Sequence, residues 1–287
     1  MTRGMHTFLG VGLALSSNGM DTARHAPEER GALCEMETAV VGGGVANEPR
    51  SASEIRHTPL ISVLIPTLNE AGELPRLLDH LAALHGHWET IVADGGSRDA
   101  TRQVAADHPL RPRVITQAGG RAAQLNAAAR VATGDILLFL HADSRLPRDA
   151  FAALAEAARA PDVAGGNFAL RFDDGSGAFE RVLGAVYRLQ RRHGLYYGDS
   201  SIWVGRARFH ELGGFREIAI MDDYDFVRRL EHGPGTTRCL PGPATTSARR
   251  WRRAGIARTV LAWFVIRRLY VAGVPPDNLA RLYRAVR

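Results

Sequence analysis

The chain has 287 residues, 45% of them hydrophobic and 23% charged, which is enough for one large globular domain or two small ones. Its formal net charge of +6 rests on 36 basic residues that are all arginine, because the sequence contains no lysine. A chain without lysine cannot hold a Walker P-loop or form a Schiff base, so both classes of enzyme are excluded.

Residues 1–58 carry scattered charges, glycines and prolines without hydrophobic periodicity, which predicts a disordered or poorly ordered N-terminal extension. The apolar run Thr7–Ser16 lacks a clean signal-peptide cleavage site. No segment reaches the roughly 18 uninterrupted apolar residues that a membrane span requires. The two cysteines, Cys34 and Cys239, have no metal-ligand spacing and favour a reducing compartment. We therefore expect a cytoplasmic protein with one folded domain over residues 59–287.

Short apolar runs alternate with helical patterns from Leu60 onward. The runs predict strands at 61–66, 89–94, 113–116 and 135–141, separated by helices over 74–84, from about 97 and over 121–131. This alternation predicts an α/β fold with a mostly parallel sheet that helices cover on both faces. In such sheets the ligand crevice lies outside the carboxyl ends of the strands.

Polar residues follow three of these predicted strands and should meet at that edge of the sheet: Pro66, Thr67, Asn69 and Glu70, then Asp94 and Gly95, then His141, Ala142 and Asp143. Each alone could be a cap or turn residue, and helix capping is the expected role of Ser97 and Asp99. Carboxylates from several strand ends together suit a divalent cation, Mg²⁺ or Mn²⁺, beside a bound diphosphate.

Two helix starts carry charged side chains of interest. Arg121 begins a predicted helix, where its guanidinium and the backbone N–H groups can both face an anion. Asp222 and Asp223 precede the helical run YDFVRRLEH, which would fix a carboxylate well enough to act as a general base. The alternative is an ordinary carboxylate stabilised by the helix dipole.

The segment Gly255–Val274 combines large apolar side chains with three arginines. This pattern predicts a helix that packs on the core and exposes its arginines to solvent. Interfacial contact with a membrane is the alternative, and it would suit a lipid-like acceptor.

The motifs SVLIPTLNE, IVADGGSRDAT, GRAAQLNAAA, GDILLFLHAD, GGF, MDDYDF and TTSARRW occur in an order that resembles family 2 of the inverting glycosyltransferases, over residues 60–287. More narrowly, the chain is similar to the branch of radical-SAM/selenodomain-associated transferase 2, the arsenosugar-biosynthesis glycosyltransferase group. The resemblance implies a GT-A fold, which is a Rossmann-like sheet flanked by helices, here with additional C-terminal helices.

The resemblance also implies roles for individual residues. Asp143 would ligate the metal, Asp223 would be the general base with Asp222 beside it, and Asp199, Arg250 and Trp251 would lie on the acceptor side. A nucleotide-sugar would bind to Pro66, Thr67, Asn69, Glu70, Asp94, Gly95, Arg121, Asn126, His141, Ala142 and Asp143.

The sequence departs from the family pattern at three places. His141 replaces the first Asp of the DxD motif, which leaves fewer carboxylates for a metal. Ser247 or Ala248 stands where processive synthases carry a Gln before Arg-Trp. Ser200 replaces the commoner Gln after Asp199, so acceptor preference should differ.

These features predict an enzyme that transfers a sugar from a nucleotide-sugar to an acceptor hydroxyl by metal-assisted single displacement, with inversion. The expected location is the cytoplasm, with peripheral contact at the inner face of the membrane as an addition. A nucleotidyltransferase and a non-catalytic nucleic-acid-binding protein are the alternatives. Nucleotidyltransferases generally use a lysine that this chain lacks, and its arginines are spread along the sequence rather than grouped with aromatics, so we expect no nucleic-acid partner.

Overall fold

The computed structural model describes residues 58–172, 178–246 and 256–286. The proposed extension over residues 1–58 therefore lies outside the described part, apart from Thr58. So do Arg250 and Trp251, the two acceptor-side residues of the Arg-Trp motif, and the neighbouring Ser247 and Ala248.

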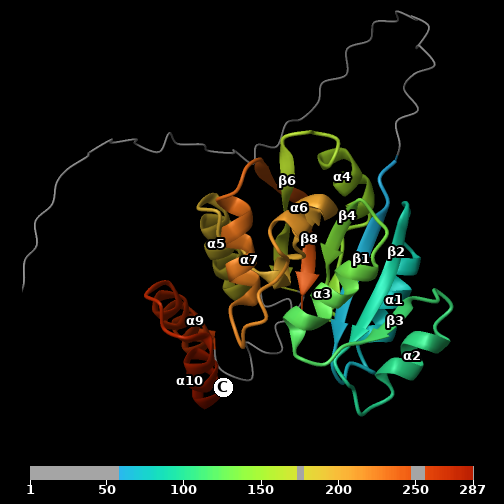
Figure 1. Ribbon diagram of the computed structural model, residues 1–287. Helices are drawn as coiled ribbons and strands as arrows, with labels where there is room; N and C mark the ends of the chain where they lie inside the picture. The colour runs from blue at the N-terminus through green and yellow to red at the C-terminus, as the bar shows by residue number, and fades with distance from the viewer. Residues whose placement is uncertain (1–57, 173–177, 247–255, 287) are drawn as a thin grey trace, which may run out of the picture. The chain divides into compact units, whose positions relative to one another are not determined.

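The first half of the fold is the predicted alternation of strands and helices (Figure 1). It comprises β1 (Ile61–Thr67), α1 (Leu74–Ala82), β2 (Trp88–Asp94), α2 (Thr101–Asp107), β3 (Arg113–Thr116), α3 (Arg121–Val131) and β4 (Ile136–Phe139). Strand β1 pairs in parallel with β2 and β4, and β2 pairs in parallel with β3. The prediction of a parallel α/β sheet is confirmed for this half.

The second half extends the sheet with strands of mixed direction. Its elements are β5 (Ser144–Arg145), α4 (Ala150–Ala157), β6 (Val163–Phe172), α5 (Ala178–Arg192), the 3₁₀ turn η1 (Gly198–Ser200), β7 (Trp203–Gly205), α6 (Arg206–Glu211), α7 (Asp222–Glu231) and β8 (Thr236–Thr246). The strand order across the sheet is β3-β2-β1-β4-β7-β6-β8-β5. Strand β7 runs antiparallel to both of its neighbours, so it marks the change from the parallel half to the mixed half.

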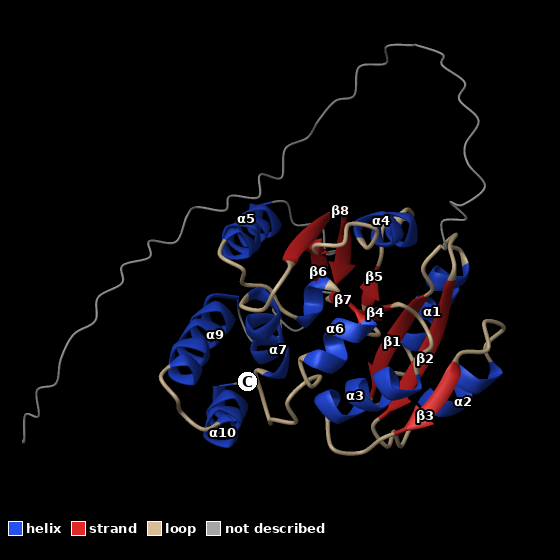
Figure 2. Ribbon diagram, turned by 45° about the horizontal axis from the view of Figure 1, so that its top comes forward, coloured by secondary structure: helices blue, strands red, loops and turns tan. Residues whose placement is uncertain are grey.

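Both faces of the central strands are buried, as a sheet covered by two helical layers requires (Figure 2). Alternate residues of β1 serve the two sides: Ile61, Val63 and Ile65 belong to one core with the leucines of α1 and α4, and Leu64 belongs to the other core with α3, α6 and α7. This double burial holds the strand ends in place at the edge where the polar loops begin.

Two helices follow the sheet, α9 (Ile256–Val271) and α10 (Pro276–Val286). A small core joins them to α7, in which Ile266 and Leu279 pack with Met221 and Tyr224. The predicted C-terminal helix with a core-packing face is thereby confirmed. Within the described residues, no helix combines the length and the apolar character needed to cross a bilayer.

Candidate active site

The loops after β1 and β2 are tied to each other at the carboxyl edge of the sheet. The backbone N–H of Asn69 donates to Ser97 Oγ at 2.9 Å, and the Asn69 side-chain oxygen accepts from the Arg98 N–H at 2.9 Å. Asn69 has a left-handed backbone with φ 58°, a conformation that Asn tolerates better than most residues. The N–H of Glu70 donates to Thr101 Oγ1 at 2.8 Å. The two predicted strand-end loops are therefore brought together as one unit.

Asp94 holds the second of these loops in shape. Its side chain is fully buried, and Oδ2 accepts from the N–H groups of Gly96 at 3.0 Å and Ser97 at 2.9 Å. Ser97 Oγ donates to the other carboxylate oxygen. Burial alone would raise the pKa of Asp94, but the hydrogen bonds from Ser97 and Gly96 outweigh burial and lower that pKa. The Asp94 carboxylate is thus ionised and stabilises the turn. The prediction that Ser97 caps α2 is wrong, because its side chain donates to Asp94 and α2 begins only at Thr101.

Asp99 lies closer to its predicted capping role. Its Oδ1 accepts from the Thr101 N–H at 3.0 Å, directly at the start of α2. Its Oδ2 accepts from the Ala71 N–H at 3.2 Å and so reaches the loop after β1.

Gln124 joins α3 to both strand ends, a contact that sequence reasoning missed. Its Nε2 donates to the carbonyl oxygens of Thr67 at 2.7 Å and Ala93 at 2.8 Å. A Cβ at Gly95 would lie 2.9 Å from the same Nε2, so the loop needs glycine there. The available sequence signal was a polar side chain on an otherwise apolar helix face.

Asn126, predicted to contact the donor, is placed against the GGF segment instead. Its Nδ2 donates to the Phe215 carbonyl at 2.8 Å, and its Oδ1 accepts from the Phe215 N–H at 2.9 Å. Asn126 therefore fixes Phe215, which in turn lines the pocket described below.

The most highly charged contact joins the starts of α3 and α7. Arg121 donates to Asp222 through Nε at 3.0 Å and Nη2 at 2.5 Å, and Nη2 lies 3.3 Å from Asp223 Oδ2. The exposed fractions of the three side chains are 35%, 7% and 14%. The structure thus brings Arg121 together with Asp222 and Asp223, two predicted site residues that lie about a hundred positions later in the sequence.

Beside Arg121, the pKa values of Asp222 and Asp223 shift in opposite directions. Burial opposes the charge of Arg121, but Asp223 and Asp222 outweigh it and raise the pKa of the guanidinium. Burial, with the neighbouring charge of Asp223, raises the pKa of Asp222 despite the ion pair. Burial would also raise the pKa of Asp223, but the charge of Arg121 and the hydrogen bond from Gly198 hold it below its ordinary value. Asp223 is therefore held in its ionised form beside the cation.

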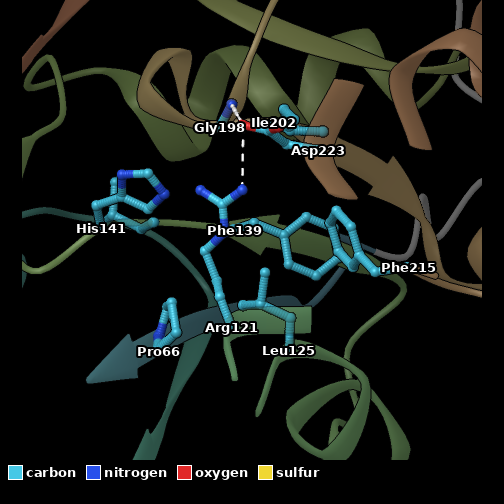
Figure 3. A pocket seen from close by; sticks show the side chains of 10 residues that line it. Pro66, Arg121, Leu125, Phe139, His141, Gly198, Ile202, Phe215 and Asp223 are labelled. Atoms are coloured by element: carbon cyan, nitrogen blue, oxygen red, sulfur yellow. Dashed lines mark hydrogen bonds and ion pairs between the residues drawn. The ribbon is translucent and has the colours of Figure 1, made fainter. Parts of the chain in front are cut away.

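Asp223 faces a small pocket (Figure 3). Its Oδ2 accepts from the Gly198 N–H at 3.0 Å, and its Oδ1 accepts from the Tyr224 N–H at 2.8 Å. Arg121 points from α3 toward Asp223, and His141 stands beside the guanidinium. The pocket walls are completed by apolar side chains and backbone from β1, α3, β4 and the loops nearby, namely Pro66, Leu125, Phe139, Leu140, Ile202 and Phe215.

Gly198 lies between His141 and the carboxylate. A Cβ added to Gly198 would lie 3.1 Å from His141 Nε2 and 3.3 Å from Asp223 Oδ2. These separations are tighter than ordinary van der Waals contact, so the absence of a side chain lets the η1 backbone reach the carboxylate.

The HAD segment follows β4 after the single residue Leu140 and forms a turn, in which the Ser144 N–H donates to the His141 carbonyl at 3.1 Å. Ala142 is buried, whereas His141 and Asp143 are partly exposed at the edge of the sheet. The described residues contain no group of three His, Cys, Asp or Glu side chains placed to hold a metal. One carboxylate still fits Mg²⁺ or Mn²⁺, since such ions often use one or two carboxylates with substrate phosphates and water.

Three tyrosines, Tyr187, Tyr197 and Tyr224, lie around η1, and we call them the tyrosine wall. Tyr187 of α5 donates to Asp199 Oδ2 at 2.8 Å, and burial with the Asp199 charge raises the Tyr187 pKa well above its ordinary value. The ring of Tyr197 stacks on Tyr224 with centroids 6.0 Å apart, and burial raises the Tyr197 pKa to about 12. Both phenols stay protonated near neutral pH, so neither competes with Asp223 as a base.

Comparison with known proteins identifies the family to which the chain belongs. The sequence profile of Glycosyl transferase family 2 matches residues 62–210, so the chain belongs to that family. A PGL/p-HBAD biosynthesis glycosyltransferase of Mycobacterium tuberculosis is 29% identical over 254 residues, covering 71% of this chain and 97% of the relative. Validoxylamine A glucosyltransferase of Streptomyces hygroscopicus is 42% identical over 93 residues, 29% of this chain and 22% of that enzyme.

Solved structures identify the fold as GT-A. The mannosyltransferase PcManGT from Pyrobaculum calidifontis, in complex with GDP-Man and Mn²⁺, has a TM-score of 0.59 at 22% identity, over 80% of this chain and 69% of that one. S. aureus TarS 1-349 has a TM-score of 0.54 at 16% identity, over 70% of this chain and 64% of that one. The protein is a glycosyltransferase, which disfavours the nucleotidyltransferase and nucleic-acid-binding alternatives.

Proposed function

We propose that the protein transfers a sugar from a nucleoside diphosphate-sugar to an acceptor hydroxyl with inversion at the anomeric carbon. The observation that carries this proposal is the ionised carboxylate of Asp223, which two backbone N–H groups orient at the wall of the pocket. Among the described residues that line this pocket, Asp223 supplies the acidic side chain. A single displacement needs one base and no second nucleophile.

In the proposed reaction Asp223 accepts the proton of the acceptor hydroxyl. The hydroxyl oxygen forms a bond to the anomeric carbon, and the bond from that carbon to the diphosphate oxygen breaks on the opposite face. The nucleoside diphosphate leaves with the electron pair. Asp222 holds the Arg121 guanidinium in place, which keeps the positive charge next to the base.

Arg121 also supports the leaving group in this proposal. Its contacts with the two carboxylates use Nε and Nη2, so Nη1 is the nitrogen that can turn to an anion. The N-terminus of α3 adds backbone N–H groups and a favourable dipole at the same place. Asp143 would hold a divalent cation, which would stabilise the negative charge that develops on the diphosphate.

The donor's nucleoside would lie over the two tied loops after β1 and β2, which include Pro66, Thr67, Asn69 and Glu70, with Asp94 and Gly95 shaping the second loop. The acceptor would approach past Asp199 and the tyrosine wall. A lipid-like acceptor is supported by a partial match to undecaprenyl-phosphate 4-deoxy-4-formamido-L-arabinose transferase of Pseudomonas fluorescens, 32% identical over 116 residues. We also propose that the protein acts in the cytoplasm. The order of the motifs supports its membership of the arsenosugar-biosynthesis branch.

The test begins with a thermal-shift screen of nucleoside diphosphates and nucleotide-sugars, with and without Mn²⁺, because a ligand that binds the folded state raises the melting temperature. The best donor is then offered to candidate acceptors, and the anomeric configuration of the product is read by NMR. Inversion is the expected result, whereas retention would overturn single displacement and the role of Asp223.

A further inference from the structure

Helix α9 exposes an apolar stripe that the fold leaves uncovered by the described residues. Its side chains lie on one face at helical spacing, and the exposed fractions are 63% for Leu261, 50% for Phe264, 39% for Val265 and 55% for Val271. Arg268 lies on the same face and is exposed. We call these five residues the α9 ridge. Figure 2 shows α9 beside α7, at the side of the molecule away from β3.

The opposite face of α9 accounts for its packing in the fold. Ile266 is buried with Met221 and Tyr224, and the ring of Trp263 lies 6.4 Å from that of Tyr197. Tyr270 donates to Asp225 of α7 at 3.0 Å. The helix is therefore apolar on both faces, and only one of them is used in the contacts among the described residues.

The charges on α9 are of one sign. The helix carries Arg258, Arg267 and Arg268, and its sequence IARTVLAWFVIRRLYV contains no acidic residue. The guanidinium carbons of Arg267 and Arg268 lie 5.8 and 5.6 Å from the centre of the Phe264 ring. Arg267 also interacts with the Tyr197 hydroxyl on the core side of the helix. Arg258 and Arg268, both exposed, are therefore the charges that can stay among anionic groups while the Phe264 ring enters an apolar layer.

We propose that the α9 ridge docks flat on the surface of an anionic lipid bilayer. The helix has 16 residues and does not meet the requirements for a membrane span, so it would lie in the plane of the interface. Arginines attract anionic head groups, and the apolar side chains enter the outer part of the acyl layer. A second copy of this chain is the competing occupant, and the experiment below distinguishes the two.

This docking would place the membrane one helix away from the active site, because α9 carries the ridge on one face and contacts the site on the other. Trp263 packs on Tyr197, whose neighbour Gly198 donates the hydrogen bond to Asp223. Asp225 receives the Tyr270 hydrogen bond from α9 three residues after the start of α7. The inference goes beyond the proposed transfer reaction, because it is tested without donor or acceptor.

The experiment is co-sedimentation of the full chain with two kinds of vesicle, phosphatidylcholine alone and phosphatidylcholine with about a third phosphatidylserine. The test variant is the double substitution Leu261→Gln and Phe264→Gln. The matched control is Leu189→Gln on α5, since Leu189 has a similar exposed fraction of 57%. Melting temperatures and circular dichroism verify that all three proteins are folded.

The expected result is binding to the anionic vesicles that weakens as salt is added, because salt screens the arginines. The double variant should bind at least about tenfold more weakly, since two large apolar side chains no longer enter the lipid, and the Leu189→Gln control should bind as the wild type does. Absence of binding by the wild type, or an equal loss in the control, would overturn the proposal. A wild-type dimer that becomes monomeric in the double variant would also overturn it and assign the ridge to a second copy.

Discussion

Arg121 and Asp222 form a two-point ion pair across the starts of two helices, with Nε to Oδ2 at 3.0 Å and Nη2 to Oδ1 at 2.5 Å. The same guanidinium neutralises Asp223 from 3.3 Å. The positive charge of Arg121 thus offsets the repulsion between two adjacent, largely buried carboxyls.

Replacing Arg121 with Gln should destabilise the fold in a pH-dependent manner. We expect a loss of about 1–3 kcal/mol near neutral pH, less than for a fully buried pair because a third of the arginine side chain is exposed. Without the cation the folded-state pKa of both carboxyls rises, so the deficit shrinks as the pH falls through these raised values and the carboxyls become protonated. Urea denaturation at several pH values measures this, and a deficit independent of pH would contradict the electrostatic explanation.

Replacing Asp223 with Asn should remove transfer while sparing the donor site. If the carboxylate is the base, turnover falls by roughly 10²–10⁴-fold, because the amide cannot take the acceptor proton. The amide oxygen can still accept the Gly198 hydrogen bond, so nucleotide-sugar affinity and melting temperature should stay close to wild type. Turnover and affinity are measured on one preparation. Near-normal turnover would reject Asp223 as the base.

Replacing Gly198 with Ala should impair catalysis more than stability. The added methyl group would stand 3.1 Å from His141 Nε2 and 3.3 Å from Asp223 Oδ2, so one of the two side chains must shift. Gly205→Ala is the control, since its nearest neighbour would be the Ala164 carbonyl at an ordinary 3.9 Å. A comparison of turnover and melting temperature separates the effects, and equal behaviour of the two variants would argue against crowding at the base.

Replacing Asp94 with Asn should lower stability at neutral pH by about 1–3 kcal/mol, because an amide cannot accept all the hydrogen bonds that Gly96 and Ser97 now donate. The lowered pKa means that the wild-type advantage is present above the unfolded value of about 4 and is lost as the pH falls through the lower folded value. Thermal denaturation from pH 7 downward, at about one-unit steps, follows this loss. An advantage that grew on acidification would refute the assignment.

Replacing Asp143 with Ala tests the proposed metal ligand. Affinity for a nucleoside diphosphate in Mn²⁺ should fall at least about tenfold, while affinity in a chelator should stay unchanged. Asp149→Ala provides a nearby exposed carboxylate as the control. Calorimetry that showed equal metal-dependent affinity in wild type and Asp143→Ala would exclude this residue as the ligand.

The strands β1 to β4 were predictable because their runs are apolar and bounded by helical patterns. Strand β8 was not, since the prolines Pro241 and Pro243 within it normally argue against a strand. Its extensive pairing with β6 depends on non-local contact: a Cβ on Gly166 would overlap the carbonyl oxygen of Arg238. No local pattern reports such a requirement.

The candidate site shows the same division between local and distant contacts. The strand-end positions followed from the rule for parallel sheets, but the partners of the polar side chains did not. Asn126 binds the backbone of Phe215, 89 residues away, and Arg121 binds Asp222 across 101 residues. Composition and spacing indicate which side chains are chemically capable, whereas only the folded chain determines which of them meet.

The direction of the two carboxylates at the start of α7 is set from both ends of its first turn. Met221 precedes the helix in a left-handed conformation with φ 70°, and the first two helical residues are the carboxylates that face Arg121. Phe226, Val227 and Leu230 of the same helix are buried in the core, which fixes the rotation of the helix about its axis. Each helical residue turns the chain by roughly 100°, so a change of length within this first turn would displace Asp223 from the Gly198 N–H and from Arg121 at once.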